Sequence, residues 1–145
     1  MNYLLPAQTL LDLCAEETNP AQAWARTVDT RSLRMSVISI AQAQGAVMRV
    51  EDAQVRARLD ADLSALIAQI EADAGPALKF DAGHAAVWKA ILHDQTLTGL
   101  GQTDRQVYAT AMHEGITVVE QGRPGGAALQ ALGVDILVLG GPDAP

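Results

Sequence analysis

Apolar residues follow two different periods along this chain. In the segment 55–70 they recur three or four positions apart, as they do on one face of a helix. These positions are Val55, Leu59, Leu63, Leu66, Ile67 and Ile70. Gly75 and Pro76 follow, and both residue types commonly end helices. The pattern therefore predicts one long amphipathic helix that ends before residue 75.

Short apolar runs separated by turn residues predict five strands. They cover residues 3–5, 33–38, 77–80, 116–119 and 134–139. Helical patterns fill the intervals at 9–17, 20–28, 39–47, 55–70, 81–97 and 104–113. The expected N-caps of four of these helices are Asn19, Ser39, Asp81 and Thr103. Strands that alternate with helices are typical of an α/β fold, with a mostly parallel sheet and helices on both faces.

The chain is of single-domain size, since 145 residues are enough to bury one core. We expect one domain over residues 1–139 and a flexible tail over residues 140–145, where glycine and proline are concentrated. Cys14 is the only cysteine, which excludes an intrachain disulfide. Neither a signal peptide nor a membrane-spanning run is visible, so we expect a cytoplasmic protein.

The formal net charge of −7 bears on possible partners. Domains that bind nucleic acid usually carry a basic patch, because neutralised phosphates release counterions. The arginines of this chain occur in twos, such as Arg56 and Arg58, rather than in a basic run. The charge balance therefore weighs against tight, non-specific binding of nucleic acid, although it leaves room for a local basic groove.

Ligand sites of parallel sheets lie beyond the carboxyl ends of the strands. That rule points to Pro6, to the helix after Ile38, to Asp104 and to the loop after Val119. The other candidate groups, three histidines and one glycine-rich segment, lack the spacing typical of metal or phosphate sites. We assign structural roles to His84, His93 and His113. The glycine-rich segment 122–126 is interpreted as a turn-rich loop rather than a phosphate cradle.

At these four places the chain resembles the PIN domains of VapC and FitB-like toxin ribonucleases. The first strand runs into Leu5-Pro6-Ala7, and the second into Ser36-Val37-Ile38-Ser39, with Ala41-Gln42 and Gly45 following. The closest match is the stretch from Asp104 to Gly115, rich in Ala and Thr and followed by a strand. The resemblance covers nearly the whole chain. It implies a three-layer PIN-like fold with strand order 3-2-1-4-5.

The resemblance also implies a divalent-metal site built from about four acids, and most of them are missing. The four positions fall at Pro6, Gln42, Asp104 and near Gly125, so Asp104 is the only retained acid and the only expected metal ligand. Gln42, an amide, occupies the family's Glu position. Glu120 would be a second carboxylate if it turned toward Asp104. Otherwise Glu120 is a solvated residue at a strand end, and Asp104 is an acid that favours a helix N-terminus.

The leading hypothesis is therefore an inactive or weakly active nuclease homologue, with no cofactor, that acts through protein or RNA binding. The family resemblance implies a homodimer and a small antitoxin-like partner, with weak RNA binding at most. The scarcity of charge in residues 10–28 and the tryptophans Trp24 and Trp88 also favour self-association.

Two alternatives remain open. The first is an active Mg²⁺- or Mn²⁺-dependent endoribonuclease toxin of a toxin–antitoxin pair. It would use Asp104 and Glu120, joined by Gln42 and by Asp94 or Asp12. The second is a doubly wound domain unrelated to the PIN family that binds a small ligand.

Overall fold

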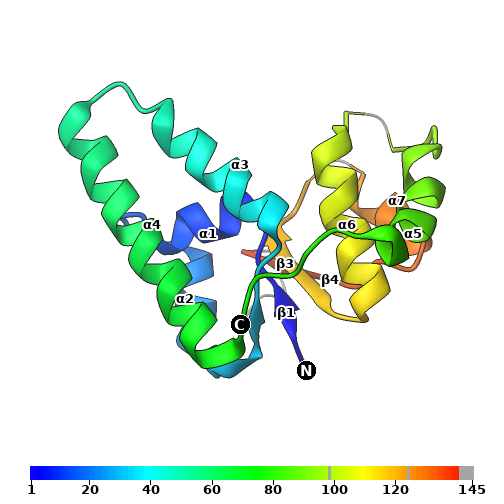
Figure 1. The fold of residues 1–145 in the computed structure, drawn as a ribbon, viewed down its shortest axis with the longest axis horizontal. Helices are drawn as coiled ribbons and strands as arrows, with labels where there is room; N and C mark the ends of the chain where they lie inside the picture. The colour runs from blue at the N-terminus through cyan, green and yellow to red at the C-terminus, as the bar shows by residue number, and fades with distance from the viewer. Residues whose placement is uncertain (98, 124, 141–145) are drawn as a thin grey trace.

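A narrow parallel sheet forms the centre of the molecule (Figure 1). The structure is a computed structural model that describes residues 1–97, 99–123 and 125–140. The strands are β1 (Tyr3–Leu4), β2 (Leu33–Arg34), β3 (Thr117–Gln121) and β4 (Ile136–Leu139). They lie in the order β2-β1-β3-β4, and every neighbouring pair is parallel. The predicted α/β class and parallel sheet are confirmed.

The prediction of five strands is wrong for the described residues, which form four. The segment 77–80 contributes a single bridge, in which Leu78 pairs with Ser36 beyond the end of β2. Leu78 donates its N–H to the carbonyl of Met35 at 2.7 Å and accepts from Val37 at 3.0 Å. No longer ladder forms because the partner chain turns into a helix at Val37. The bridge nevertheless places this segment at the edge of the sheet where the predicted order put its strand.

Seven α-helices and one short 3₁₀ helix surround the sheet in the described residues. They are α1 (Ala7–Leu13), α2 (Pro20–Ala25), η1 (Thr30–Ser32), α3 (Val37–Met48), α4 (Ala53–Ala74), α5 (Ala82–Leu92), α6 (Gln102–Glu114) and α7 (Gly126–Ala131). The long amphipathic helix is confirmed as α4, which ends at Gly75. Helix α7 was not predicted. Its N-cap is Gly125, whose φ of 87° suits a residue without a side chain.

Two of the predicted helix caps are wrong. Ser36 rather than Ser39 caps α3, since Ser36 Oγ accepts the N–H of Ser39 at 3.0 Å. Gly101 rather than Thr103 stands at the N-cap of α6, so Thr103 lies inside the helix. In both cases the helix starts earlier than the apolar pattern suggested. The caps at Asn19 and Asp81 are confirmed, because each accepts a backbone N–H of its own helix.

Two apolar cores cover the opposite faces of the sheet. Adjacent residues of a strand point to opposite faces, and accordingly Leu5 and Val119 belong to one core while Leu4 and Val118 belong to the other. The first core packs against α1 to α4, which we call the first arm. The second packs against α5 to α7, which we call the second arm (Figure 1). Helices on both faces of the sheet are thereby confirmed.

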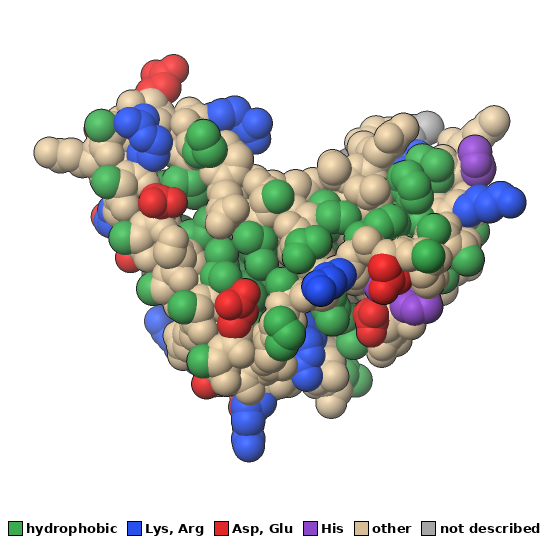
Figure 2. All heavy atoms as spheres, viewed as in Figure 1, with side chains coloured by type: hydrophobic (Ala, Val, Ile, Leu, Met, Phe, Trp, Pro, Cys, Tyr) green, Lys and Arg blue, Asp and Glu red, His purple; other side chains and the backbone are tan. Residues whose placement is uncertain are grey.

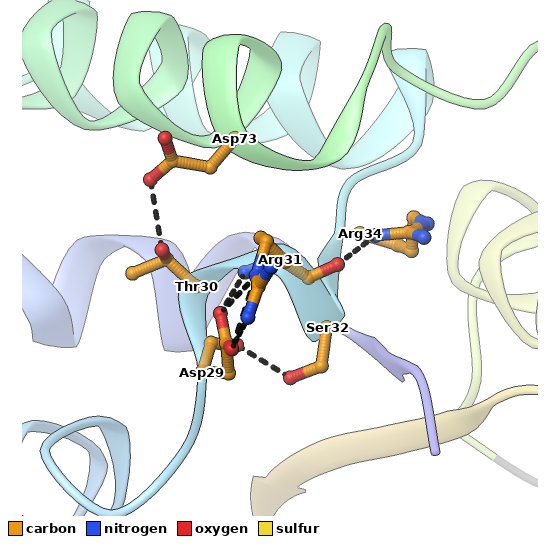
Figure 3. Close-up of polar contacts among 6 residues, drawn as sticks. All are labelled: Asp29, Thr30, Arg31, Ser32, Arg34 and Asp73. Atoms are coloured by element: carbon orange, nitrogen blue, oxygen red, sulfur yellow. Dashed lines mark hydrogen bonds and ion pairs between the residues drawn. The ribbon is translucent and has the colours of Figure 1, made fainter.

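The edge strand β2 is held to the first arm by a small polar cluster (Figure 3). Asp29 caps η1 by accepting the N–H of Arg31 at 2.8 Å, and its carboxylate also accepts from the Arg31 guanidinium. Thr30 Oγ1 donates to Asp73 Oδ2 of α4 at 2.8 Å. The cluster therefore ties the chain just before β2 to the end of the longest helix.

Arg105 holds the connection between α5 and α6. Its guanidinium donates to the carbonyl of Ile91 at 2.5 Å, near the end of α5. It also donates to carbonyls of the following loop, namely those of Leu97 at 2.6 Å and Leu100 at 3.0 Å. A planar guanidinium with several fixed donors suits such a convergence of carbonyls. One side chain of α6 thus fixes the conformation of the loop that leads into that helix.

No helix of the described part combines the length and the apolar character needed to cross a membrane. Residues 141–145, which make up most of the predicted tail, lie outside the described residues.

Candidate functional site

A cleft of about 450 Å³ opens between α3 of the first arm and α6 of the second arm, beyond the carboxyl ends of β1 and β3. Figure 2 shows the hollow between the two arms. The cleft is lined by Pro6, Gln42, Asp104 and Glu120, which the sequence placed together. Gly125 is not among the described residues that line it, because it stands at the start of α7.

Asp104 lies in the first turn of α6, as predicted, with both carboxylate oxygens near polar groups of other elements. Its Oδ1 accepts a hydrogen bond from Gln42 Nε2 of α3 at 3.1 Å. Its Oδ2 lies 3.5 Å from a guanidinium nitrogen of Arg123, which follows β3. The carboxylate of Asp104 therefore already has an amide and a cation as partners.

Glu120 is buried rather than solvated, with 7% of its surface exposed, so the simpler interpretation of this residue is wrong. It lies within β3, which extends to Gln121 and carries the side chain into the cleft. Both of its carboxylate oxygens lie within hydrogen-bond distance of the Tyr108 hydroxyl, at 2.8 and 2.7 Å. Burial raises the pKa of Glu120, although the Tyr108 hydrogen bond and the charge of Arg123 partly offset this.

Arg123 joins the two acids into one network. Its guanidinium donates to the Tyr108 hydroxyl at 3.1 Å while it pairs with Asp104. The same guanidinium carbon lies 5.9 Å from the centroid of the Tyr108 ring, within the range of a cation–π contact. Burial and the nearby charge of Glu120 raise the pKa of Tyr108, so the phenol stays protonated and donates. Arg123 therefore contacts Asp104 directly and is linked to Glu120 through the Tyr108 hydroxyl.

This donor set does not fit a Mg²⁺ site. Mg²⁺ needs oxygen ligands in near-octahedral geometry, and in the cleft the positive charge beside Asp104 is that of Arg123. Two unit charges about 4 Å apart interact by roughly 4 kcal/mol at an effective dielectric constant of about 20. The guanidinium of Arg123 would repel a divalent cation beside Asp104 and so offsets part of the attraction of the two carboxylates. Pro6, which has no side-chain oxygen, adds nothing to the ligand set.

The additional acids of the active-nuclease alternative lie elsewhere. Asp12 of α1 accepts a hydrogen bond from Gln8 at 2.9 Å and borders a neighbouring hollow instead of the cleft. Asp94 follows α5, where its carboxylate accepts the N–H of Thr96 at 2.8 Å. Neither residue lines the cleft, so neither can join Asp104 in one ligand set.

Sequence reasoning missed the functional potential of Tyr108 and Arg123. Tyr108 stands four residues after Asp104 in a helix, and that spacing places two side chains on one face. This signal was available in the sequence. Arg123 lies in a loop without a periodic pattern, so only the turn of the chain after β3 brings it to Asp104.

Removing the Tyr108 hydroxyl should destabilise the protein. Tyr108→Phe leaves the buried carboxylate of Glu120 without its hydroxyl donor, and a buried group that loses its partner costs about 1–3 kcal/mol. Urea unfolding should show this loss in the free energy of unfolding. Tyr3→Phe is the matched control, since Tyr3 packs edge-on against Trp24 at 5.1 Å between ring centroids. Equal losses in the two variants would contradict the proposed role of the hydroxyl.

Comparison with known proteins gives a clear result at the level of fold. No protein-family model and no curated protein sequence matches the chain. Among solved structures, FitAcB from Neisseria gonorrhoeae matches with a TM-score of 0.76 and 22% identity, over 93% of this chain and 96% of that chain. DNA-bound VapBC from Salmonella typhimurium matches with a TM-score of 0.74 and 16% identity, over 95% of this chain and 98% of that chain.

A third match is VapBC2 from Rickettsia felis, which was solved bound to a DNA fragment from the promoter. It has a TM-score of 0.73 and 13% identity, over 95% of this chain and 98% of that chain. In all three cases the alignment spans almost the full length of both chains, while the identity is low. The chain therefore has the PIN-domain fold of the FitB and VapC toxins, as the resemblance in its sequence predicted.

Proposed function

We propose that this chain is a nuclease homologue of PIN fold that does not use a divalent ion to cleave RNA and that acts through binding. The observation that carries the proposal is the position of Arg123, which pairs with Asp104 and donates to the hydroxyl that holds Glu120. A metal-dependent nuclease needs negative charge that a cation can neutralise and a metal-bound water as nucleophile. In this cleft an arginine of the chain itself supplies the neutralising charge.

The binding partners that we propose are a second copy of the chain and a small antitoxin-like protein. The matched structures come from complexes whose names combine two components, FitAcB and VapBC. Apolar surface supports a partner here as well. Met48 at the end of α3 is 78% exposed, and Val55 near the start of α4 is 40% exposed. Contact with another protein would remove these side chains from water. RNA would bind weakly, in line with the net charge of −7.

The alternative is a Mg²⁺- or Mn²⁺-dependent endoribonuclease, and one observation favours it. Asp104 and Glu120 line the same cleft, and two carboxylates together with substrate phosphates are a known way to hold Mg²⁺. For this function Arg123 would have to leave Asp104 when the ion binds.

Metal titration and RNA cleavage distinguish the two functions. We expect calorimetry to detect no Mg²⁺ binding below the millimolar range at the cleft, because little negative charge is left to hold the ion against its hydration shell. Structured and single-stranded RNA should stay intact with Mg²⁺ or Mn²⁺, for the unmodified chain and for Asp104→Asn alike. Cleavage that disappears both with EDTA and with Asp104→Asn would establish the endoribonuclease instead.

A further inference from the structure

A second group of chemically capable side chains lies in the second arm, away from the cleft. His84 and His113, which the sequence offered no reason to pair, lie with ring centroids 4.5 Å apart. Glu114 is beside them, and one ligand atom of each of the three residues lies within 4.8 Å of the others. His113 is in the last turn of α6, whereas Asp104 is in its first. Nine residues of helix put about 14 Å between the two sites.

His84 has an unusual pair of partners. It is buried, with 3% of its surface exposed, and Phe80 stacks on its ring. Its Nδ1 lies 2.9 Å from Asp81 Oδ1, and its Nε2 lies 2.9 Å from Glu114 Oε1. A neutral imidazole carries one hydrogen, on one nitrogen only. The backbone N–H of Asp81 also lies 3.2 Å from Nδ1, so each ring nitrogen has a polar partner in either neutral tautomer.

With the ring hydrogen on Nδ1, the Nε2 lone pair faces the Glu114 carboxylate. A metal ion bound by both groups would satisfy that contact after a small separation of the two ligand atoms, and the surroundings of Nε2 suit an ion. Glu114 and His113 bring a carboxylate oxygen and a second imidazole to the same point. The second histidine is a further nitrogen ligand for a metal at this point.

The contact with Asp81 matches the outer shell of known metal sites. Histidines that bind metals usually donate their other ring N–H to a carboxylate, which fixes the tautomer and orients the ring. In the tautomer with the hydrogen on Nδ1, His84 would donate to Asp81 Oδ1 and Nε2 would be free to bind. In the other tautomer, Nδ1 accepts the backbone N–H of Asp81 at 3.2 Å, so a bound metal would select the first. Asp81 is itself fixed as the N-cap of α5, where it accepts the N–H of Gly83 at 2.9 Å. The ring of His113 lies close to Gly83 of α5, 3.2 Å from where a Cβ on that residue would stand.

We propose that His84, His113 and Glu114 bind a divalent transition-metal ion of the zinc class, with Asp81 as the residue that orients His84. Two imidazoles and one carboxylate are a ligand set that Zn²⁺ accepts, with water in the fourth tetrahedral position. Nitrogen ligands disfavour Mg²⁺ and Ca²⁺. His113 and Glu114 are both on the surface, so the ion can enter from solvent. Figure 2 shows acidic and histidine side chains together on the second arm.

Zinc titration tests the proposal without reference to nuclease activity. After dialysis against EDTA, calorimetry with Zn²⁺ should give one ion per chain. His113→Gln and Glu114→Gln should each weaken binding at least about tenfold. Asp81→Asn should weaken it by roughly 10–100-fold, which is typical when an outer-shell partner is lost. An asparagine can still cap α5, so this variant should fold.

His93→Gln is the matched control, because His93 lies in the same arm at the end of α5 but outside the cluster. Its affinity for Zn²⁺ should equal that of the unmodified chain. Zn²⁺ should also raise the Tm of the unmodified chain and of His93→Gln, since a ligand that binds only the folded state stabilises it. The proposal is overturned if no saturable binding appears, or if His113→Gln binds Zn²⁺ as tightly as His93→Gln does.

Discussion

A variant that carries Pro6→Asp, Gln42→Glu and Arg123→Gln should bind Mn²⁺ at least about a hundredfold more tightly than the unmodified chain. The three changes take the formal charge of the residues lining the cleft from −1 to −4. A carboxylate about 4 Å from a unit charge contributes roughly 4 kcal/mol at an effective dielectric constant of about 20. A gain of a hundredfold corresponds to about 2.8 kcal/mol, well within that range even after repulsion among the acids.

The backbone of position 6 can accept the new residue. Pro6 is the N-cap of α1, with φ −65° and ψ 168°, and it provides no side-chain cap. Aspartate is among the preferred N-cap residues. Calorimetry with Mn²⁺ measures the gain. Adding Asp104→Asn to the triple variant is the control, and it should remove most of the increase. If the triple variant binds Mn²⁺ no better than the unmodified chain, these positions do not surround one ion.

Arg105→Met should lower the free energy of unfolding by about 3 kcal/mol. The methionine keeps the apolar stem but loses the guanidinium, which donates to Ile91, Leu97 and Leu100. Hydrogen bonds that involve a charged group contribute about 1.5–3 kcal/mol each, and their effects are not additive within one network. We therefore expect a net loss in the free energy of unfolding that equals one or two such bonds. Most of it should come from the contact at the end of α5.

Urea denaturation measures this effect, with Arg31→Met as the control. The Arg31 side chain is 78% exposed and pairs with the exposed Asp29. Its replacement should change stability by no more than about 0.5 kcal/mol. A similar small change for Arg105→Met would show that its contacts with the loop carbonyls contribute little to folding.

Much of the fold was visible in the sequence because apolar periodicity and strand–helix alternation are local signals. The repeat from Val55 to Ile70 specified α4, and Asn19-Pro20 specified the start of α2. Helix α7 was missed because a glycine-rich start suggests a turn. Its N-cap is Gly125 in the left-handed region, which has no side chain to form a capping hydrogen bond, so the usual sequence signal of a helix start is missing. The prediction of a strand at residues 77–80 was wrong for another reason. The length of this pairing depends on where the neighbouring segment turns into α3.

The location of the candidate site could be predicted from the sequence, whereas the burial and the partners of its side chains could be predicted only in part. Motif order brought Pro6, Gln42 and Asp104 to one cleft, since parallel strands end at the same edge of the sheet. Burial of Glu120 was not predictable, because it depends on how α6 packs on β3. The same holds for His84 and His113, which are far apart in sequence and meet only because α5 and α6 lie side by side.

The sheet between the two arms is narrow. β1 is joined to β2 and to β3 through two residue pairs each, and the arms pack on opposite faces of this sheet. The hydrogen bond from Gln42 to Asp104 crosses the cleft from one arm to the other. A ligand that binds either side chain must replace this bond, so occupation of the cleft is linked to the contact between α3 and α6.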